Sequence, residues 1–345
     1  MQFLNRLPRK LLFPPLALLA FVAVACSKKT DNPPADGPAK ALPPLVAKTA
    51  PPFDGAAAMK SVVQQVSFGP RVPNSAAHDH ELKYIQTELA KYTSAVSLQP
   101  FTETGYDGST LNLTNVVASF NPSATDRILI LTHWDSRPWA DEDKDSTNRN
   151  KPVPAANDGG SGTAVMLELA KAMKDNPPPI GVDLLFDDGE DYGKPSIDEL
   201  NKYFLGAKFF VKTKPADYNP RFAILLDMVG DKKAEFKPEG NSQRSAPQFT
   251  AEIWRAAQDL GLTTFKQIAG PTIEDDHLPF IQGGIPAVDI IDGDLVGAHT
   301  QDPDRKYWHT THDLPNNVSD KTLDEVGRLL LYLIYERLPN SIRSL

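Results

Sequence analysis

Apolar runs alternate with amphipathic stretches through the C-terminal two thirds of the chain. Continuous apolar runs predict strands at residues 113–120, 127–131, 182–186, 222–226 and 287–291. Apolar positions recur at helical spacing in residues 161–174, 197–212, 246–260 and 319–338. Apolar strands separated by such helices are typical of a parallel sheet that is covered on both faces. We therefore expect an α/β fold, in which a mostly parallel, twisted mixed β-sheet carries helices on both faces.

Two further helices are predicted before the first strand. The first ends at Gly69-Pro70, because a helix cannot continue through this pair, and the second spans about residues 76–93. At 345 residues and 41% hydrophobic content, the chain can form one large core. The formal net charge of −8 does not favour nucleic-acid binding, which usually needs a basic face. It favours solubility and, weakly, a cationic ligand such as a peptide amino terminus.

The N-terminal segment has the pattern of a secretory signal over residues 1–25. Basic residues precede an apolar run, residues 11–24, that ends in small residues and is too short for a comfortable membrane span. Cys26 is the only cysteine, and its position resembles the lipobox of bacterial lipoproteins. We expect a lipidated Cys26 that anchors an exported protein to a membrane of the bacterial cell envelope. An ordinary cleaved signal is the alternative. Residues 26–53 then form a Pro-rich tether, and residues 54–345 the catalytic domain.

Short acidic or histidine-bearing segments follow the predicted strands. They are His133-Trp134-Asp135-Ser136, Asn157-Asp158-Gly159-Gly160, Asp188-Gly189-Glu190-Asp191 and Trp308-His309-Thr310. Taken singly, each has a simple structural explanation, such as a turn or a helix N-cap for Asn-Asp-Gly. Adjacent carboxylates such as Glu190-Asp191, however, repel each other unless a cation or a proton lies between them. Imidazole and carboxylate ligands without thiolates predict a catalytic zinc site at the C-terminal ends of the strands.

The order of these motifs resembles the family of co-catalytic zinc aminopeptidases and glutaminyl cyclases. The resemblance runs from about residue 54 to the end and rests on Gly69-Pro70-Arg71-Val72-Pro73, His133-x-Asp135, Asn157-Asp158-Gly159, Gly189-Glu190-Asp191, Asp227, Asp275-Asp276-His277 and His309-Thr310. It implies that Asp158, Asp191 and His309 hold a zinc ion shared by both branches. It further implies that Glu190 is the general acid/base.

The two branches differ in their metal content and in the chemistry expected of each residue. In an aminopeptidase, His133 and Asp227 would complete a second zinc site bridged by Asp158, and two ions would hold a hydroxide. In a cyclase, one zinc polarises the side-chain amide of an amino-terminal glutamine. Glu190 then moves a proton from the α-amine to departing ammonia, and Asp227 and Asp275 form the surrounding acid network.

Several runs look more like the bacterial cyclase branch. They are residues 133–140, 273–280 and 285–291, together with Trp308 directly before His309. The resemblance implies that Asp135 orients a metal ligand, and it assigns Trp139, Tyr203, Asp289 and Trp308 to the surroundings of the metal or to the substrate pocket. The chain departs from the branch in having no tryptophan between Trp139 and Trp254. Tyr203 is the nearest aromatic substitute.

Three functions remain open on sequence alone. A glutaminyl cyclase with one zinc is favoured, an aminopeptidase with two zinc ions is the second, and a non-catalytic lipoprotein that keeps the fold for binding is the third. Glu190 argues against the third, because a pure binder has no need of a proton-shuttling acid beside metal ligands. For both enzymes the expected partners are peptide or protein amino termini.

Overall fold

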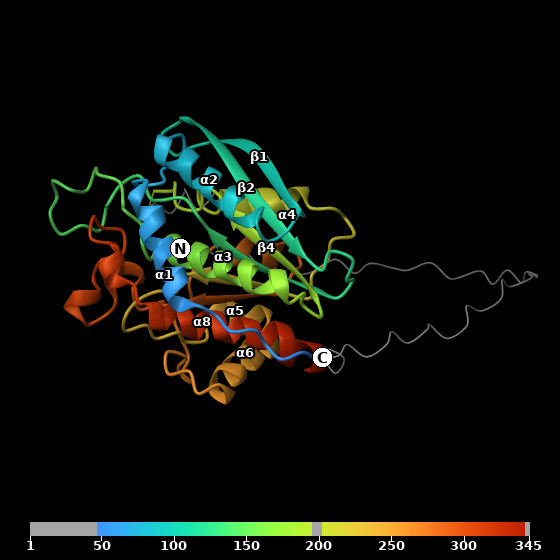
Figure 1. The fold of residues 1–345 in the computed structure, drawn as a ribbon. Helices are drawn as coiled ribbons and strands as arrows, with labels where there is room; N and C mark the ends of the chain where they lie inside the picture. The colour runs from blue at the N-terminus through green and yellow to red at the C-terminus, as the bar shows by residue number, and fades with distance from the viewer. Residues whose placement is uncertain (1–46, 195–201, 342–345) are drawn as a thin grey trace, which may run out of the picture. The chain divides into compact units, whose positions relative to one another are not determined.

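The strands follow the predicted apolar runs and assemble into one mixed sheet. The computed structural model describes residues 47–194 and 202–341. Within these residues the sheet has six strands in the order β1-β2-β4-β3-β5-β6. Figure 1 labels β1, β2 and β4 of this sheet. The strands are β1 (Val96–Thr104), β2 (Thr110–Phe120), β3 (Arg127–His133), β4 (Gly181–Asp187), β5 (Ala223–Asp227) and β6 (Ala287–Ile291). β3, β4, β5 and β6 run parallel to one another, whereas β2 pairs antiparallel with both β1 and β4. The expected mostly parallel sheet is therefore confirmed.

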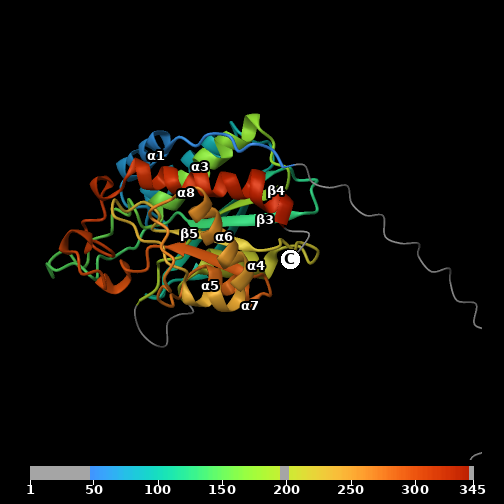
Figure 2. The ribbon, with the colours of Figure 1, turned by 90° about the horizontal axis from the view of Figure 1, so that it is seen from below.

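Helices cover both faces of this sheet because its strands alternate two sets of apolar side chains. The helices are α1 (Gly55–Ser67), α2 (Ala76–Leu89), α3 (Gly160–Asp175), α4 (Leu205–Thr213), α5 (Gly240–Ser245), α6 (Pro247–Asp259), α7 (His277–Gln282), α8 (Asp320–Tyr332) and α9 (Leu338–Ser341). Ile128 and Ile130 of β3 join the core formed with α1, α2, α3, α6 and α8. Leu129 and Leu131 join the core formed with α4 and α7. Figure 2 shows α3 and α8 on one side of β3 and β4, and α4 and α7 on the other.

Some elements differ from the sequence prediction. β1, α5 and α7 were not predicted, whereas β6 has the predicted bounds. Of the predicted helix at residues 197–212, residues 197–201 lie outside the described residues, and α4 begins only at Leu205. It begins there because Phe204 has a left-handed backbone (φ 61°), which a helix cannot include. The predicted helix at 319–338 is interrupted after α8 by a wider π-helical turn, Leu333–Arg337.

Residues 47–53, which were predicted to belong to the tether, already pack against the folded core. The predicted signal, Cys26 and the tether up to residue 46 lie outside the described residues. Lys48 donates from its backbone N–H to the carbonyl of Tyr335 (3.0 Å) and from Nζ to that of Pro177 (2.8 Å). Phe53 is buried against Gly327, where a side chain would collide with its ring. Packing therefore starts within residues 47–53. Among residues 47–194 and 202–341, no helix has the length and apolar content needed to cross a membrane.

Candidate active site

The predicted site residues meet at one edge of the sheet. His133 is the last residue of β3 and Asp227 the last of β5, while Glu190 and Asp191 lie in the turn that follows β4. Because β3, β4 and β5 are parallel, their carboxyl ends lie together at this edge. Asp158 reaches the same place from the turn before α3. His309, from the long loop before α8, completes the cluster.

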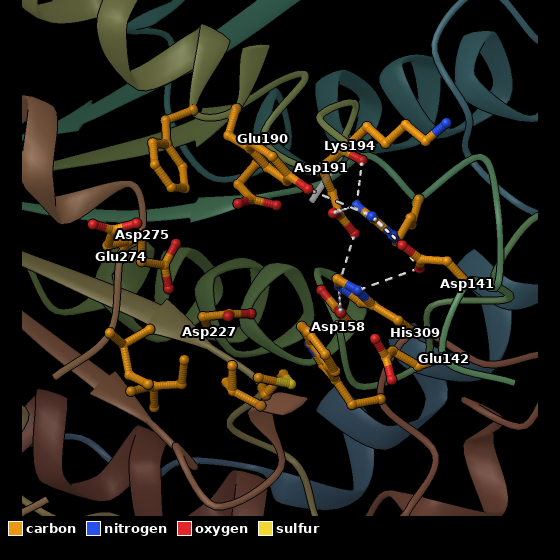
Figure 3. Close-up of a pocket in the computed structure, with 18 residues that line it drawn as sticks. Asp141, Glu142, Asp158, Glu190, Asp191, Lys194, Asp227, Glu274, Asp275 and His309 are labelled. Carbon is orange, nitrogen blue, oxygen red and sulfur yellow. Dashed lines mark hydrogen bonds and ion pairs between the residues drawn. The ribbon is translucent and has the colours of Figure 1, made fainter. Parts of the chain in front are cut away.

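Among the described residues, two groups of candidate metal ligands share Asp158. One is His133, Asp158 and Asp227, and the other is Asp158, Asp191 and His309. In the second group, Nε2 of His309 lies 3.6 Å from Oδ2 of Asp158 and 3.5 Å from Oδ2 of Asp191. In the first, Nε2 of His133 lies 3.1 Å from Oδ1 of Asp158 and 3.5 Å from Oδ1 of Asp227. Asp158 therefore presents one oxygen to each histidine. Figure 3 shows Asp158, Asp191 and His309 converging.

The group of Asp158, Asp191 and His309 fits a zinc ion in both spacing and donor type. At zinc–ligand distances of about 2.0–2.2 Å, two ligands of a tetrahedral ion lie roughly 3.3–3.6 Å apart. The contacts of His309 at 3.5 and 3.6 Å match this spacing. Burial, with the positive charges of Arg137 and His133, lowers the pKa of His309 well below its usual value. The imidazole is therefore neutral, which is the form that binds a metal.

His133 has a different environment. Its distance of 3.1 Å to Asp158 is shorter than the spacing expected for two ligands of one tetrahedral zinc. Burial lowers the pKa of His133, but its contacts with Asp135, Asp158 and Asp227 outweigh burial and raise that pKa well above the usual value. This raised pKa favours a protonated ring that pairs with Asp158 and Asp227.

Asp135 connects the end of β3 with the turn that follows β4. Its Oδ1 lies 3.4 Å from Nδ1 of His133 and accepts the backbone N–H of Glu190 at 3.0 Å. Its Oδ2 accepts the backbone N–H of Asp191 at 3.3 Å. The side chain is fully buried. Asp135 thus orients one histidine and holds the backbone that carries Glu190 and Asp191.

Unusual backbone conformations occur at or beside three of the candidate ligands, Asp158, Asp227 and His309. Gly159 has φ 80°, and a Cβ there would lie 2.9 Å from Cε1 of His133, so only glycine lets Asp158 and the His133 ring come this close. Met228, directly after Asp227, and His309 also have left-handed backbones, at φ 46° and φ 53°. Such conformations cost energy in residues other than glycine and cluster at functional sites.

Glu190 is a partly exposed acid with a raised pKa. Burial, followed by the charge of Asp191, raises the pKa of Glu190 well above its usual value. Burial and the charge of Asp227 do the same for the pKa of Asp275, and burial raises the pKa of Asp227. These acids line one pocket together (Figure 3). A raised pKa makes the carboxylate of Glu190 a stronger base, which suits a group that accepts a proton and returns it.

The pocket is small and has an aromatic wall. Its volume is about 260 Å³, which suits one side chain rather than a long peptide. Tyr203 and Trp308 line it, and the Trp308 ring stacks on His309 with ring centroids 3.6 Å apart. His133 does not line it and is buried, with Nε2 3.1 Å from Oδ1 of Asp158.

Two residues expected around the pocket lie outside its lining. Trp139 contacts the rings of Tyr106 and Tyr192 edge-on, with centroids 4.7 and 5.6 Å apart. Asp289 is buried in β6, with Oδ2 3.8 Å from Nδ1 of His277. Neither therefore forms the wall of the pocket.

Comparison with known proteins places this arrangement in a family. Residues 115–334, more than half of the chain, match the family model described as peptidase family M28. The chain belongs to peptidase family M28. Among solved structures, a glutaminyl cyclase from Bacteroides thetaiotaomicron is 37% identical with a TM-score of 0.78, covering 84% of this chain and 99% of that chain. A leucine aminopeptidase precursor from the same species has the same identity, coverage and TM-score. A glutaminyl-peptide cyclotransferase from Bos taurus is 25% identical over 301 residues, 78% of each chain.

Sequence reasoning missed several residues that support the site of this M28 enzyme. Arg137 donates to Asp191 at 2.5 Å, and Asp141 lies 3.7 Å from Nδ1 of His309. Asp313 accepts the backbone N–H groups of Asn157 and Asp158 at 2.9 and 3.0 Å, which fixes the turn carrying the shared ligand. Arg137 lies inside the run at residues 133–140 that the resemblance singled out, so its position was visible. Its role depends on neighbours distant in the sequence.

Proposed function

We propose that this M28 enzyme is a glutaminyl-peptide cyclotransferase, which converts an amino-terminal glutamine to pyroglutamate and releases ammonia. The observation that carries the proposal is that all three members of the ligand group Asp158, Asp191 and His309 line the small pocket, whereas the other group has one member, His133, that does not. Cyclisation brings its own nucleophile, the α-amine, and needs one Lewis acid only. The named relatives include both cyclases and an aminopeptidase, so their names alone do not decide.

The side chains of the pocket have distinct tasks in this reaction. A zinc ion held by Asp158, Asp191 and His309 would supply a Lewis acid for the oxygen of the glutamine side-chain amide. Glu190 accepts a proton from the α-amine as that nitrogen bonds to the amide carbon, and returns it to the nitrogen that leaves as ammonia. Tyr203 and Trp308 enclose the planar amide. Asp227 and Asp275 complete the acid network around Glu190.

Aminopeptidase activity is the second candidate, and one observation favours it. His133, Asp158 and Asp227 form a second possible ligand group that shares Asp158 with the first. A peptidase gains from two ions that hold one hydroxide. On the cyclase proposal we expect one zinc per chain, and on the aminopeptidase proposal two.

Three peptides that differ only at their amino terminus distinguish the two activities. The purified, zinc-loaded protein is incubated with Gln-Phe-Ala, Leu-Phe-Ala and N-acetyl-Gln-Phe-Ala, and the products are weighed by mass spectrometry. The cyclase proposal requires loss of ammonia from the first peptide alone, because acetylation removes the nucleophile. Release of free leucine from the second peptide would establish an aminopeptidase instead.

We also propose that the protein is exported and anchored to a membrane of the bacterial cell envelope through a lipid on Cys26. The support is the signal-like pattern of residues 1–25 followed directly by the single cysteine. Two variants of the full-length chain test the anchor. Cys26→Ala should move the protein from the membrane fraction to the soluble fraction and abolish labelling by a fatty acid, whereas Ser27→Ala should do neither. An unlabelled wild-type chain in the soluble fraction would disprove lipidation.

A further inference from the structure

The buried guanidinium of Arg137 contacts a candidate metal ligand directly. Its Nη1 donates to Oδ1 of Asp191 at 2.5 Å and to the carbonyl oxygen of the same residue at 3.3 Å. Only 1% of the Arg137 side chain is exposed. Asp191 is held both at its carboxylate and at its backbone, so neither can rotate independently of Arg137.

This contact divides the two oxygens of Asp191. Oδ1 is taken by Arg137, and Oδ2 lies 3.5 Å from Nε2 of His309, on the side of the candidate zinc ligands. A carboxylate can bind a metal through one oxygen or through both. A charge-assisted hydrogen bond on Oδ1 favours binding through Oδ2 alone.

A second acid fixes the guanidinium itself. Nε and Nη2 of Arg137 donate to the two oxygens of Asp141 at 2.8 and 2.7 Å, a paired geometry that sets the plane of the guanidinium. Oδ1 of Asp141 also lies 3.7 Å from Nδ1 of His309. Asp141 therefore stands between Arg137 and the ring whose other nitrogen faces the ligand group.

The same guanidinium supports the aromatic wall of the pocket. Its central carbon lies 5.9 Å from the ring centroid of Tyr203 and 5.6 Å from that of Trp139. Its Nη2 lies 3.5 Å from the Tyr203 hydroxyl. One side chain thus ties the ligand Asp191 to the wall against which a substrate would rest.

We propose that Arg137, held by Asp141, is a positioning residue that restricts Asp191 to one metal-binding oxygen and so keeps a coordination position open for the substrate. The inference rests on the metal site of the proposed function, but not on which of the two reactions the site performs. A catalytic zinc needs such an open position, and a second oxygen from Asp191 would fill it.

Cobalt(II) in place of zinc reports the coordination number directly. Four-coordinate cobalt absorbs visible light more strongly than five-coordinate cobalt, so the spectrum measures how many ligand atoms bind. Arg137→Met keeps an unbranched apolar stem and removes the donors. We expect its cobalt spectrum to weaken relative to wild type as Asp191 binds through both oxygens. The zinc-loaded variant should lose about 10- to 100-fold in kcat.

Metal affinity alone would not test the proposal. Removing Arg137 loosens Asp191, which weakens binding, but it also removes a positive charge near the metal, which strengthens binding. The cobalt spectrum is recorded with a metal ion in every site, so these opposing effects on metal affinity do not influence it. Arg137→Lys, which keeps the charge and one donor, should restore part of the wild-type spectrum, and Asp141→Asn should weaken the spectrum less than Arg137→Met.

Arg127→Met is the matched control. Arg127 stands at the start of β3 and also pairs with an aspartate, Asp183, at 2.7 Å, but on the edge of the sheet opposite the site. It should alter stability and leave the cobalt spectrum unchanged. Wild-type spectra in folded Arg137→Met and in Asp141→Asn would overturn the proposal, and Asp141→Asn alone decides if Arg137→Met does not fold. If the spectra change as expected but glutamine peptides release no ammonia, the proposed reaction fails and the positioning role stands.

Discussion

Asp135 accepts a hydrogen bond from the backbone N–H of Glu190 at 3.0 Å. The acid two residues beyond β3 thereby fixes the turn beyond β4, and the backbone of the proposed proton carrier cannot shift without breaking this contact. Because the same carboxylate lies 3.4 Å from Nδ1 of His133, the two strand ends share one buried anchor.

Replacing Asp135 by alanine should therefore impair catalysis without removing the metal. We expect turnover to fall about 10- to 100-fold, since supporting residues of metal sites have effects of this size. The zinc content, measured by atomic absorption, should stay at the wild-type value because Asp158, Asp191 and His309 are intact. Asp183→Asn, at the opposite edge of the sheet, serves as the control. Unchanged turnover in Asp135→Ala would show that the contact does not position Glu190.

Glu190→Gln removes the proton carrier and keeps its size. Turnover should fall by about two to four orders of magnitude, because general acid–base catalysis contributes this much. The pH dependence should change as well. In the wild type the raised pKa of Glu190 makes activity rise with pH as the carboxylate forms, and the residual activity of the variant should lack this rise. Near-normal turnover in a metal-loaded variant would remove Glu190 from its proposed role.

The variant His133→Ala distinguishes a site with one zinc ion from a site with two. His133 does not line the pocket, so we expect about one zinc per chain in both the wild type and the variant. Asp227→Asn should likewise keep its zinc and lose activity through the acid network. Metal content per chain, measured after removal of excess zinc, gives the answer. Two ions in the wild type and one in His133→Ala would favour the aminopeptidase.

Glu81, in α2, makes stability depend on pH. Neither of its buried carboxylate oxygens has a hydrogen-bond partner among the described residues. Burial raises the pKa of Glu81 from 4.5 to about 7, against the opposing charges of Arg71 and His78. The folded protein therefore keeps a proton that the unfolded chain has lost. Its contribution to stability is complete below pH 4.5 and is lost as the pH rises to about 7.

Glu81→Gln removes this dependence because glutamine is neutral at every pH. Urea denaturation at about pH 4 should give equal free energies of unfolding for variant and wild type. At about pH 8 the variant should be more stable by about 3 kcal/mol. This is the free energy that corresponds to the rise of the Glu81 pKa from 4.5 to about 7. A difference between the two proteins that is the same at both pH values would contradict the assignment.

The sequence predicted the parallel part of the sheet because its strands are buried on both faces and read as continuous apolar runs. β6 has the predicted bounds for this reason. β1 was missed because it is an edge strand, mostly exposed, with Pro100 in its middle, so it shows no apolar run. The start of α4 depends on the left-handed backbone of Phe204, which no local pattern announces.

The candidate ligands were predictable because parallel strands end at one edge, and motifs at their carboxyl ends must meet. Residues that act through distant partners were not. Arg137 and Asp191 are 54 positions apart, and Asp313 and Asp158 are 155 apart, so only the folded chain shows that they touch. The placement of Asp289 outside the lining of the pocket was equally hidden, because strand alternation alone does not say how deep a side chain lies.

The contacts of Lys48 have a consequence for the way the enzyme meets its substrates. Lys48 touches Pro177, shortly before β4 begins, whereas the pocket lies beyond the point where β4 ends. The polypeptide therefore enters the folded body at the edge of the sheet opposite the pocket. A ligand can thus reach the pocket without passing the point where the chain enters the folded body.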